Sequence, residues 1–377
     1  MKRWTALALC ALILITSLTA CGTPVPDPSP SPSTSEEPMV EYDWDAAYAA
    51  YSPDTVVMTV NGQDVTWSEY FYWYNTLYVS RANGNALDTE LDDSDGMTLG
   101  EFLKLNTEGY CIQYHVIDMQ AEANSAVLTD EDQAVLDEQL KSDIEEYGGE
   151  EGTEEALYEY LAGLYITPEL YNYINRMTVL YPRLFVTLYG AVGEKMSDED
   201  TMAFAEDYGF MTAKHILFRT TDDSGNALSD GEIASKRAQA EDVLAELNAV
   251  PESEREALFD ELMNEYSEDP GLENYPNGYC FEPGTMVQEF EDAVTALEPG
   301  GISDIVESSS GYHIIMREPV TPEDSVMLGT AQVYTLRYAA SVMAFNELFN
   351  GWITSAELVY TDEFADFNMG DILKVIE

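Results

Sequence analysis

Basic residues are scarce in this sequence. It has 16 Lys and Arg against 71 Asp and Glu in 377 residues, a formal net charge of −55. A chain with this charge repels the phosphates of DNA and RNA, so nucleic acid is not among its expected partners. Neither a G-x-x-x-x-G-K-[ST] nor a G-x-G-x-x-G pattern occurs, which leaves nucleotide chemistry without support.

Histidine and cysteine are also few, with three His and four Cys. No H-E-x-x-H or C-x-x-C spacing occurs, so we expect no metal centre and no cofactor. Four cysteines cannot form a dense disulfide framework. Cys111 and Cys280 could pair in an oxidising compartment, but two small buried apolar residues are the favoured interpretation.

The first residues have the pattern of a targeting signal. Lys2 and Arg3 precede a short uncharged apolar stretch, and residues 1–20 are therefore expected to be a signal peptide. Leu-Thr-Ala-Cys at its end resembles a bacterial lipobox, which implies that Cys21 is lipidated and anchors the protein outside the cytoplasm on the bacterial cell membrane. The alternative is an ordinary secretory signal with a cysteine there by chance.

The rest of the chain divides by composition. Residues 21–54 are rich in Pro and Ser and favour an extended linker. Residues 55–208 favour helices after a short hairpin at 56–60 and 63–66, which turns at Asn61-Gly62. Four helices are predicted in this region, with start signals at Thr66, Thr129, Thr167 and Ser197 and expected ends near 78, 146, 180 and 207. At the first of them, Thr66 and Glu69 are expected to form a capping box. His115 lies in a further apolar helical stretch and is expected to be a core residue with hydrogen-bond partners.

Residues 209–319 change character. We expect a strand at 211–219, three helices, and strands near 302–306 and 312–317. In residues 320–377, a helix from 321 to about 350 and an edge strand at 358–364 are expected to pack back on the N-terminal helices. The sequence therefore predicts an α+β fold, with a small antiparallel sheet and its helices inserted into a mainly α-helical module.

Two stretches, 213–219 and 266–318, carry a specific set of motifs. They contain AKHILF, then YSEDPG, then FEDAVTALEPGGIS, and finally GYHII. Together these closely resemble the parvulin class of peptidyl-prolyl cis-trans isomerases. The V-N-G opening followed by T-W-S-E-Y, with the lipoprotein signal, is similar to foldases of the PrsA and SurA type. The resemblance implies isomerisation of X–Pro bonds in unfolded or partly folded secreted polypeptides, with chaperone activity in the helical module.

The resemblance also implies site residues. Its catalytic positions fall on His215, Asp269, Ser308, Ser310 and His313. Its prolyl-pocket positions fall on Met286 and Phe290, with Phe281 and Tyr279 beside them. The alternative is structural: the two histidines would pin the sheet, Met286 and Phe290 would be core, and Asp269 would form a turn before Pro270.

Two departures from the family pattern bear on activity. The family commonly has G-D-L-G where this chain has Asn277-Gly278-Tyr279-Cys280, so a pocket leucine is missing. Parvulins directed at phosphate carry a basic cluster after the first histidine, whereas this chain has Arg219 beside Asp222 and Asp223. Such a loop disfavours phosphorylated substrates.

Two other functions compete with the isomerase. A non-catalytic holdase chaperone could keep the parvulin fold with a degenerate pocket. A solute-binding lipoprotein would share the signal and linker, but it would need two α/β lobes, whereas only one such unit is predicted.

Overall fold

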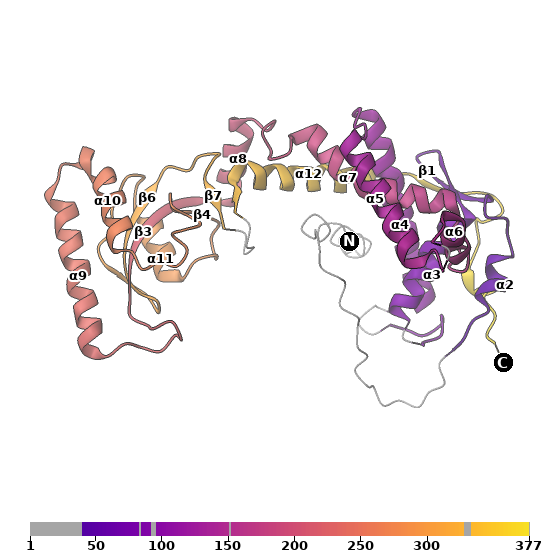
Figure 1. Cartoon of the computed structure of the whole chain (residues 1–377), viewed down its shortest axis with the longest axis horizontal. Coiled ribbons are helices and arrows are strands. Elements are labelled where there is room, and N and C mark those ends of the chain that lie inside the picture. Colours follow the sequence, from indigo (N-terminus) through magenta and orange to yellow (C-terminus); the bar gives the residue numbers. More distant parts are fainter. Residues whose placement is uncertain (1–39, 83, 92–95, 151, 328–332, 377) are drawn as a thin grey trace. The chain divides into compact units, whose positions relative to one another are not determined.

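The computed structural model describes residues 40–376 except 83, 92–95, 151 and 328–332 (Figure 1). Its contacts divide the chain into two compact units. One combines the residues up to Leu188 with those from Asn346 onward, and the other spans Tyr189–Phe345. Both helices and sheets are present, which confirms the mixed fold class.

Some predicted features fall outside the part of the chain that the structure describes. The signal peptide, the lipidated Cys21 and most of the linker lie outside the described residues. The second unit is wider than the predicted 209–319 range, and the predicted domain ranges stay predictions. Among the described residues, no helix is both long enough and apolar enough to cross a membrane.

The first unit contains helices around a three-stranded sheet of order β2-β1-β9. Its elements are α2 (Trp44–Tyr48), β1 (Val56–Val60), β2 (Gln63–Thr66), α3 (Trp67–Arg81), α4 (Leu99–Ala123), α5 (Asp130–Tyr147), α6 (Glu154–Ala162), α7 (Pro168–Tyr189), β9 (Leu358–Tyr360) and a 3-10 turn (Met369–Asp371). The hairpin forms as predicted because Asn61 and Gly62 take positive φ angles of 51° and 85°.

The core of this unit is aromatic. Helix α3 buries residues on nearly every face, as its sequence predicts, and Trp67 packs near Phe364 and Phe367 from the end of the chain. Strand β9 pairs with β1 as an antiparallel edge strand. The C-terminal residues therefore complete the core of the first unit.

Two local predictions in this unit are wrong. Thr66 caps α3 as expected, but the carboxylate of Glu69 bonds His115 at 3.1 Å instead of closing a capping box. His115 also contacts Gln63 at 3.2 Å, so it is a buried histidine with partners, as expected. Helix α7 does not end near residue 180 but continues through Pro182, because its apolar face stays buried on both sides of the proline.

The second unit contains a six-stranded sheet of order β5-β6-β3-β4-β7-β8. Its elements are α8 (Asp198–Tyr208), β3 (Met211–Arg219), α9 (Asp230–Ala249), α10 (Glu252–Tyr266), β4 (Tyr279–Phe281), α11 (Gln288–Ala296), β5 (Val306–Glu307), β6 (Gly311–Glu318), β7 (Ser325–Val326) and β8 (Tyr334–Thr335). Helix α12 (Leu336–Ser355) begins in this unit.

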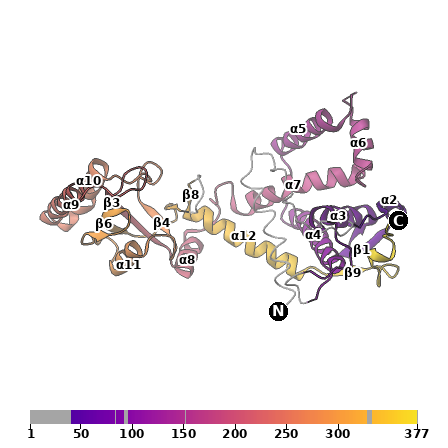
Figure 2. The same cartoon turned by 90° about the horizontal axis from the view of Figure 1, so that it is seen from below.

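The central strands β3 and β6 are buried on both faces of the sheet. Side chains alternate along a strand, so Ile216 and Ile314 pack under α9 and α10, whereas Ala213 and Ile315 pack against α11. Figures 1 and 2 show α9 and α10 together and α11 apart from them across the sheet. The α11 face is the one that carries the predicted site.

Three elements of this unit were predicted wrongly. The strand expected near 302–306 is only the two-residue β5, and Ile302 makes an isolated bridge to Met316. Strand β4 was missed because it has only three residues, all buried, and so shows no alternation. The helix expected from residue 321 begins only at Leu336, after β7 and β8. The start signal at 321 forms a turn instead, because Thr321 bonds Asp324, whose carboxylate also accepts from Thr212 across 2.5 Å.

Both described cysteines are free and buried. Cys111 lies in α4 and Cys280 in β4, in different units. Burial raises the pKa of the Cys280 thiol to about 12. The interpretation as small buried apolar residues is therefore confirmed.

Candidate functional site

The register of β3 and β6 places two histidines on one face. Leu217 pairs with His313 and His215 with Ile315, so the two imidazoles are diagonal neighbours on the α11 side of the sheet. Their Nδ1 atoms lie 3.0 Å apart, and the rings are nearly parallel at 18°. Both residues are buried, His215 at 8% and His313 at 4% exposure.

The histidine pair is the centre of a longer hydrogen-bond chain. His215 Nε2 lies 3.2 Å from Asp269 Oδ2, and His313 Nε2 lies 2.7 Å from Ser308 Oγ. An ionised carboxylate only accepts, so His215 Nε2 carries a proton and its Nδ1 accepts from His313 Nδ1–H. His313 Nε2 then accepts the Ser308 hydroxyl proton. One assignment of the protons therefore satisfies the whole hydrogen-bond chain.

Asp269 is held ionised by its neighbours. Burial alone would raise the pKa of this carboxyl group, but hydrogen bonds from His215 and Tyr279 outweigh burial and lower the pKa to about 2. The Tyr279 hydroxyl donates to Oδ2 at 2.6 Å, and the Gly271 amide donates to Oδ1 at 3.1 Å. The carboxylate therefore stays charged and fixed at neutral pH.

The second histidine is kept uncharged. Burial and, next in size, the neighbouring His215 lower the pKa of His313 to about 4, against a smaller opposing effect of Asp269. At neutral pH this imidazole is neutral, as the tautomer assignment requires.

Apolar side chains border the polar chain. Phe290 on α11 presents its ring to both imidazoles, 5.3 Å from His215 and 5.9 Å from His313 between centroids. Phe281 on β4 lies 5.9 Å from Phe290, and Met286 packs half-buried against the same cluster. The residues predicted for a prolyl pocket thus come together beside the predicted polar residues.

Two predicted residues lie at the edge of this arrangement. Ser310 is exposed, and its backbone amide donates to Ser308 Oγ at 3.1 Å. Tyr279 was predicted to lie beside the prolyl pocket; its hydroxyl bonds the carboxylate, and its ring lies 5.9 Å from that of His215. No spacing in the sequence signalled this bond, since ten residues separate Tyr279 from Asp269.

Sequence reasoning also missed Glu291. This buried residue on α11 accepts hydrogen bonds from the backbone amides of Gly284 and Met286, at 2.8 to 3.0 Å. It stands inside the FEDAVTAL motif, where an acidic residue after Phe290 looks like part of a solvated helix face.

The loop after β3 has no free basic group for a phosphate. Arg219 Nη1 bonds Asp223 at 2.9 Å, and Arg219 Nη2 bonds the Asp222 carbonyl at 2.9 Å. Both terminal nitrogens of this guanidinium therefore already have an acidic or a carbonyl partner.

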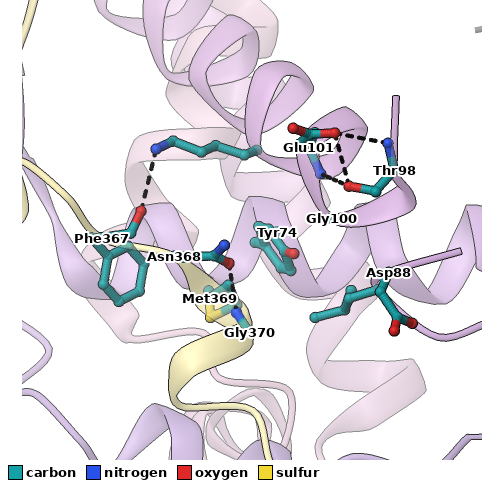
Figure 3. A pocket seen from close by; sticks show the side chains of 11 residues that line it. Tyr74, Asp88, Thr98, Gly100, Glu101, Phe367, Asn368, Met369 and Gly370 are labelled. Atoms are coloured by element: carbon teal, nitrogen blue, oxygen red, sulfur yellow. Dashed lines mark hydrogen bonds between the residues drawn. The ribbon is translucent and has the colours of Figure 1, made fainter. Parts of the chain in front are cut away.

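A separate pocket of about 450 Å³ lies in the first unit, between the start of α4 and the 3-10 turn near the C-terminus (Figure 3). Apolar parts of Tyr74, Leu87 and Met369 line it together with Asp88 and Lys104. Lys104 Nζ donates to the Phe367 carbonyl at 3.2 Å. This hollow contains none of the predicted site residues.

Comparison with known proteins gives a family match over one part of the chain. Residues 215–319 match the rotamase family described as a PPIC-type PPIase domain. This range contains every predicted catalytic and pocket residue.

Individual relatives agree with this match. The Cbf2 protein of Campylobacter jejuni is 37% identical over 108 residues, which are 28% of this chain and 34% of that protein. The foldase protein PrsA of Geobacillus sp. WCH70 is 50% identical over 60 residues, 15% of this chain and 21% of that protein. The match therefore spans about a third or less of these two relatives. The foldase protein PrsA of Caldanaerobacter subterraneus is 26% identical over 293 residues, 74% of this chain and 79% of that protein.

Solved structures with related chains include PrsA from Bacillus subtilis, at 19% identity and a TM-score of 0.26, covering 80% of this chain and 93% of that one. PrsA from Lactococcus lactis is 14% identical with a TM-score of 0.31, covering 82% of this chain and 96% of that one.

Proposed function

Residues 215–319 form a parvulin-type domain in a PrsA-like chain, and from this premise we propose that the protein is a foldase that isomerises X–Pro bonds in secreted polypeptides. X–Pro bonds rotate over a barrier of roughly 18–20 kcal/mol and can limit folding for tens of seconds or longer. Because the reaction makes and breaks no covalent bond, it requires no nucleophile and no cofactor.

The apolar cluster is suited to the proline ring. The half-buried Met286 and the buried Phe290 and Phe281 lie beside the imidazole pair, and they are the apolar side chains against which a pyrrolidine ring would pack. The ring of Tyr279 belongs to the same apolar cluster, and its hydroxyl donates a hydrogen bond to Asp269. The ring would be held while the peptide on the other side of the amide turns.

The hydrogen-bond chain from Ser308 to Tyr279 would supply the electrostatic contribution to catalysis. A planar amide places partial negative charge on its oxygen through the same resonance that gives the C–N bond its double-bond character. A fixed carboxylate beside that oxygen disfavours the charge-separated form and so favours the twisted amide. Asp269 is ionised and held by three donors, and His215, which is itself bonded to His313, keeps its orientation.

The observation that carries this proposal is the continuous chain Ser308–His313–His215–Asp269–Tyr279 beside the aromatic cluster. A direct test uses the mature chain from residue 21 with Cys21→Ser, and follows cis-to-trans exchange of an unphosphorylated X–Pro peptide by NMR. We expect catalysis by the wild type and a loss of about 100-fold in kcat/KM for Asp269→Ala.

The matched control is Glu273→Gln, an exposed carboxylate on the same loop, which should change kcat/KM by less than about twofold. Folded wild-type protein without turnover would rule out the isomerase. Equal losses in Asp269→Ala and Glu273→Gln would rule out this site.

A second candidate function is holding unfolded chains, and the pocket of Figure 3 favours it because the helical unit has a hollow of its own that is lined by both apolar and polar residues. This function is separable from turnover. Folded Asp269→Ala protein should suppress aggregation of a denatured client without proline as well as the wild type does. Loss of suppression in that variant would contradict a separate holdase role.

Membrane anchorage outside the cytoplasm is also part of the proposal. It is supported by the signal pattern of residues 1–20 and the lipobox-like residues before Cys21. Expression of the full chain in a bacterium should give a membrane-associated protein, and Cys21→Ser should release it. A Cys21→Ser protein that stays with the membrane fraction would contradict lipidation at this residue.

A further inference from the structure

Glu291 is a buried acid on α11, next in sequence to Phe290 of the aromatic cluster, with 8% of its surface exposed. Its position follows Phe290, whose ring contacts both imidazoles. Charged groups are seldom buried without partners, because removal from water disfavours the ionised form. A carboxylate at this place therefore needs specific hydrogen bonds.

Those hydrogen bonds come from the loop before α11. Gly284 N–H donates to both carboxylate oxygens at 2.9 and 3.0 Å, and Met286 N–H donates to Oε1 at 2.8 Å. Gly284 has a φ of +91°, a conformation that other residues rarely adopt. The N-cap residue Val287 makes no side-chain cap, so Glu291 is the acid that fastens this loop to the helix.

One of the two amides that Glu291 binds belongs to Met286, the methionine of the prolyl pocket. Met286 has a flexible, unbranched side chain and is only half-buried, so its own packing does not fix its place. Its backbone amide is fixed by Glu291, one residue along the helix from Phe290. The two pocket walls, Met286 and Phe290, are therefore set at a fixed separation through a single carboxylate.

We propose that Glu291 is a positioning residue that holds Met286 in the wall of the prolyl pocket, an inference that rests on the proposed isomerase function. Glu291 itself lies outside the Ser308–His313–His215–Asp269 chain, so it acts on substrate binding and not on the twisting of the amide. Its loss should raise KM and leave kcat nearly unchanged, because binding of the proline ring is shared by ground and transition states.

The test combines kinetics with amide hydrogen exchange on the mature chain with Cys21→Ser. Glu291→Ala should raise KM for the X–Pro peptide about tenfold, with kcat within about twofold. Glu291→Gln keeps one accepting oxygen but brings an NH₂ group near the Gly284 amide, so a rise of about threefold is expected. Exchange at the Gly284 and Met286 amides should accelerate at least about tenfold in Glu291→Ala.

Glu289→Gln is the matched control, since Glu289 is an exposed acid in the first turn of the same helix. It should change neither KM nor the exchange rates. Gly284→Ala should weaken the hydrogen bonds between the Gly284 amide and Glu291, because alanine disfavours the positive φ at this position. It should therefore raise KM in the same way. This variant keeps the test valid if Glu291→Ala does not fold.

Unchanged exchange at Met286 in Glu291→Ala would overturn the inference, as would a fall in kcat at constant KM. A wild type without turnover would instead overturn the proposed isomerase. The exchange rates would then still decide whether Glu291 fixes the position of Met286.

Discussion

The hydroxyl of Tyr279 donates to Oδ2 of Asp269 at 2.6 Å, the same oxygen that His215 bonds from the other side. The tyrosine occupies the position where related domains commonly have a pocket leucine. It therefore adds a donor to the polar chain that a leucine could not supply. Burial and the carboxylate raise the pKa of Tyr279, so the phenol keeps its proton and remains a donor at neutral pH.

Tyr279→Phe should reduce kcat/KM about tenfold at pH 7, because Asp269 loses a charge-assisted hydrogen bond and with it part of its fixed orientation. The NMR exchange assay measures this directly. Tyr275→Phe is the control: its ring packs 4.6 Å from that of Tyr279, and it should change kcat/KM by less than about twofold. Equal effects of the two substitutions would show that the Tyr279 hydroxyl does not act on Asp269.

Ser308 and Ser310 were both predicted as site residues, and the structure separates them. Ser308 Oγ bonds His313, whereas the exposed Ser310 contributes only its backbone amide to Ser308. Ser308→Ala should therefore lower kcat/KM about three- to tenfold, since His313 loses the donor at Nε2. Ser310→Ala leaves the amide in place and should have almost no effect. A larger loss from Ser310→Ala would contradict this assignment.

As the pH falls, the second unit should lose stability through His313 at a higher pH than through Asp269. The pKa of His313 is about 4 in the folded protein and about 6.5 in the unfolded chain, so the unfolded state binds the proton first. Stability is then lost as the pH falls from about 6.5 to about 4. Asp269, with its pKa at about 2, adds a further loss only as the pH falls below about 3.8.

Hydrogen exchange of β3 and β6 at pH 7.0, 5.5 and 4.5, analysed by mass spectrometry as local opening free energies, measures this loss. In His313→Gln the change between pH 7.0 and 4.5 should be smaller, because the titrating group is gone. If wild type and His313→Gln show the same pH dependence, another group causes it.

The C-terminal segment should be required for the stability of the first unit. Phe364 is fully buried, and its ring lies 4.7 Å from that of Tyr51. Phe364→Ala should lower the free energy of unfolding by about 3–5 kcal/mol, through lost burial and a remaining cavity. Urea unfolding followed by tryptophan fluorescence reports on this unit, because Trp44, Trp67, Trp73 and Trp352 all belong to it.

Val359→Ala provides the control on the neighbouring strand. Val359 is 50% exposed, so its truncation should cost less than about 1 kcal/mol. Similar costs for the two variants would mean that the C-terminal segment is not part of the core.

The sequence alone determined the features whose cause lies within a few residues. Strand β3 has the predicted bounds, the hairpin turns at Asn61-Gly62, and the capping boxes at Thr129 and Ser229 form with Asp132 and Glu232. These depend on backbone preferences and on bonds to the third residue along the chain, which tertiary contacts rarely overturn. The motif also identified the residues of the candidate site.

Only the tertiary structure decided how distant groups pair. Glu69 bonds His115 instead of forming the expected capping box. Residues 321–324 form a turn instead of starting a helix, and Asp324 accepts a hydrogen bond from Thr212. The Tyr279 hydroxyl donates a hydrogen bond to Asp269, and Glu291 accepts one from the backbone amide of Met286. For Glu69, a short-range pattern offered the carboxylate one partner, and burial beside another segment offered a different one. Which partner a buried polar group binds depends on what packs against it, and that is settled only when the whole unit folds.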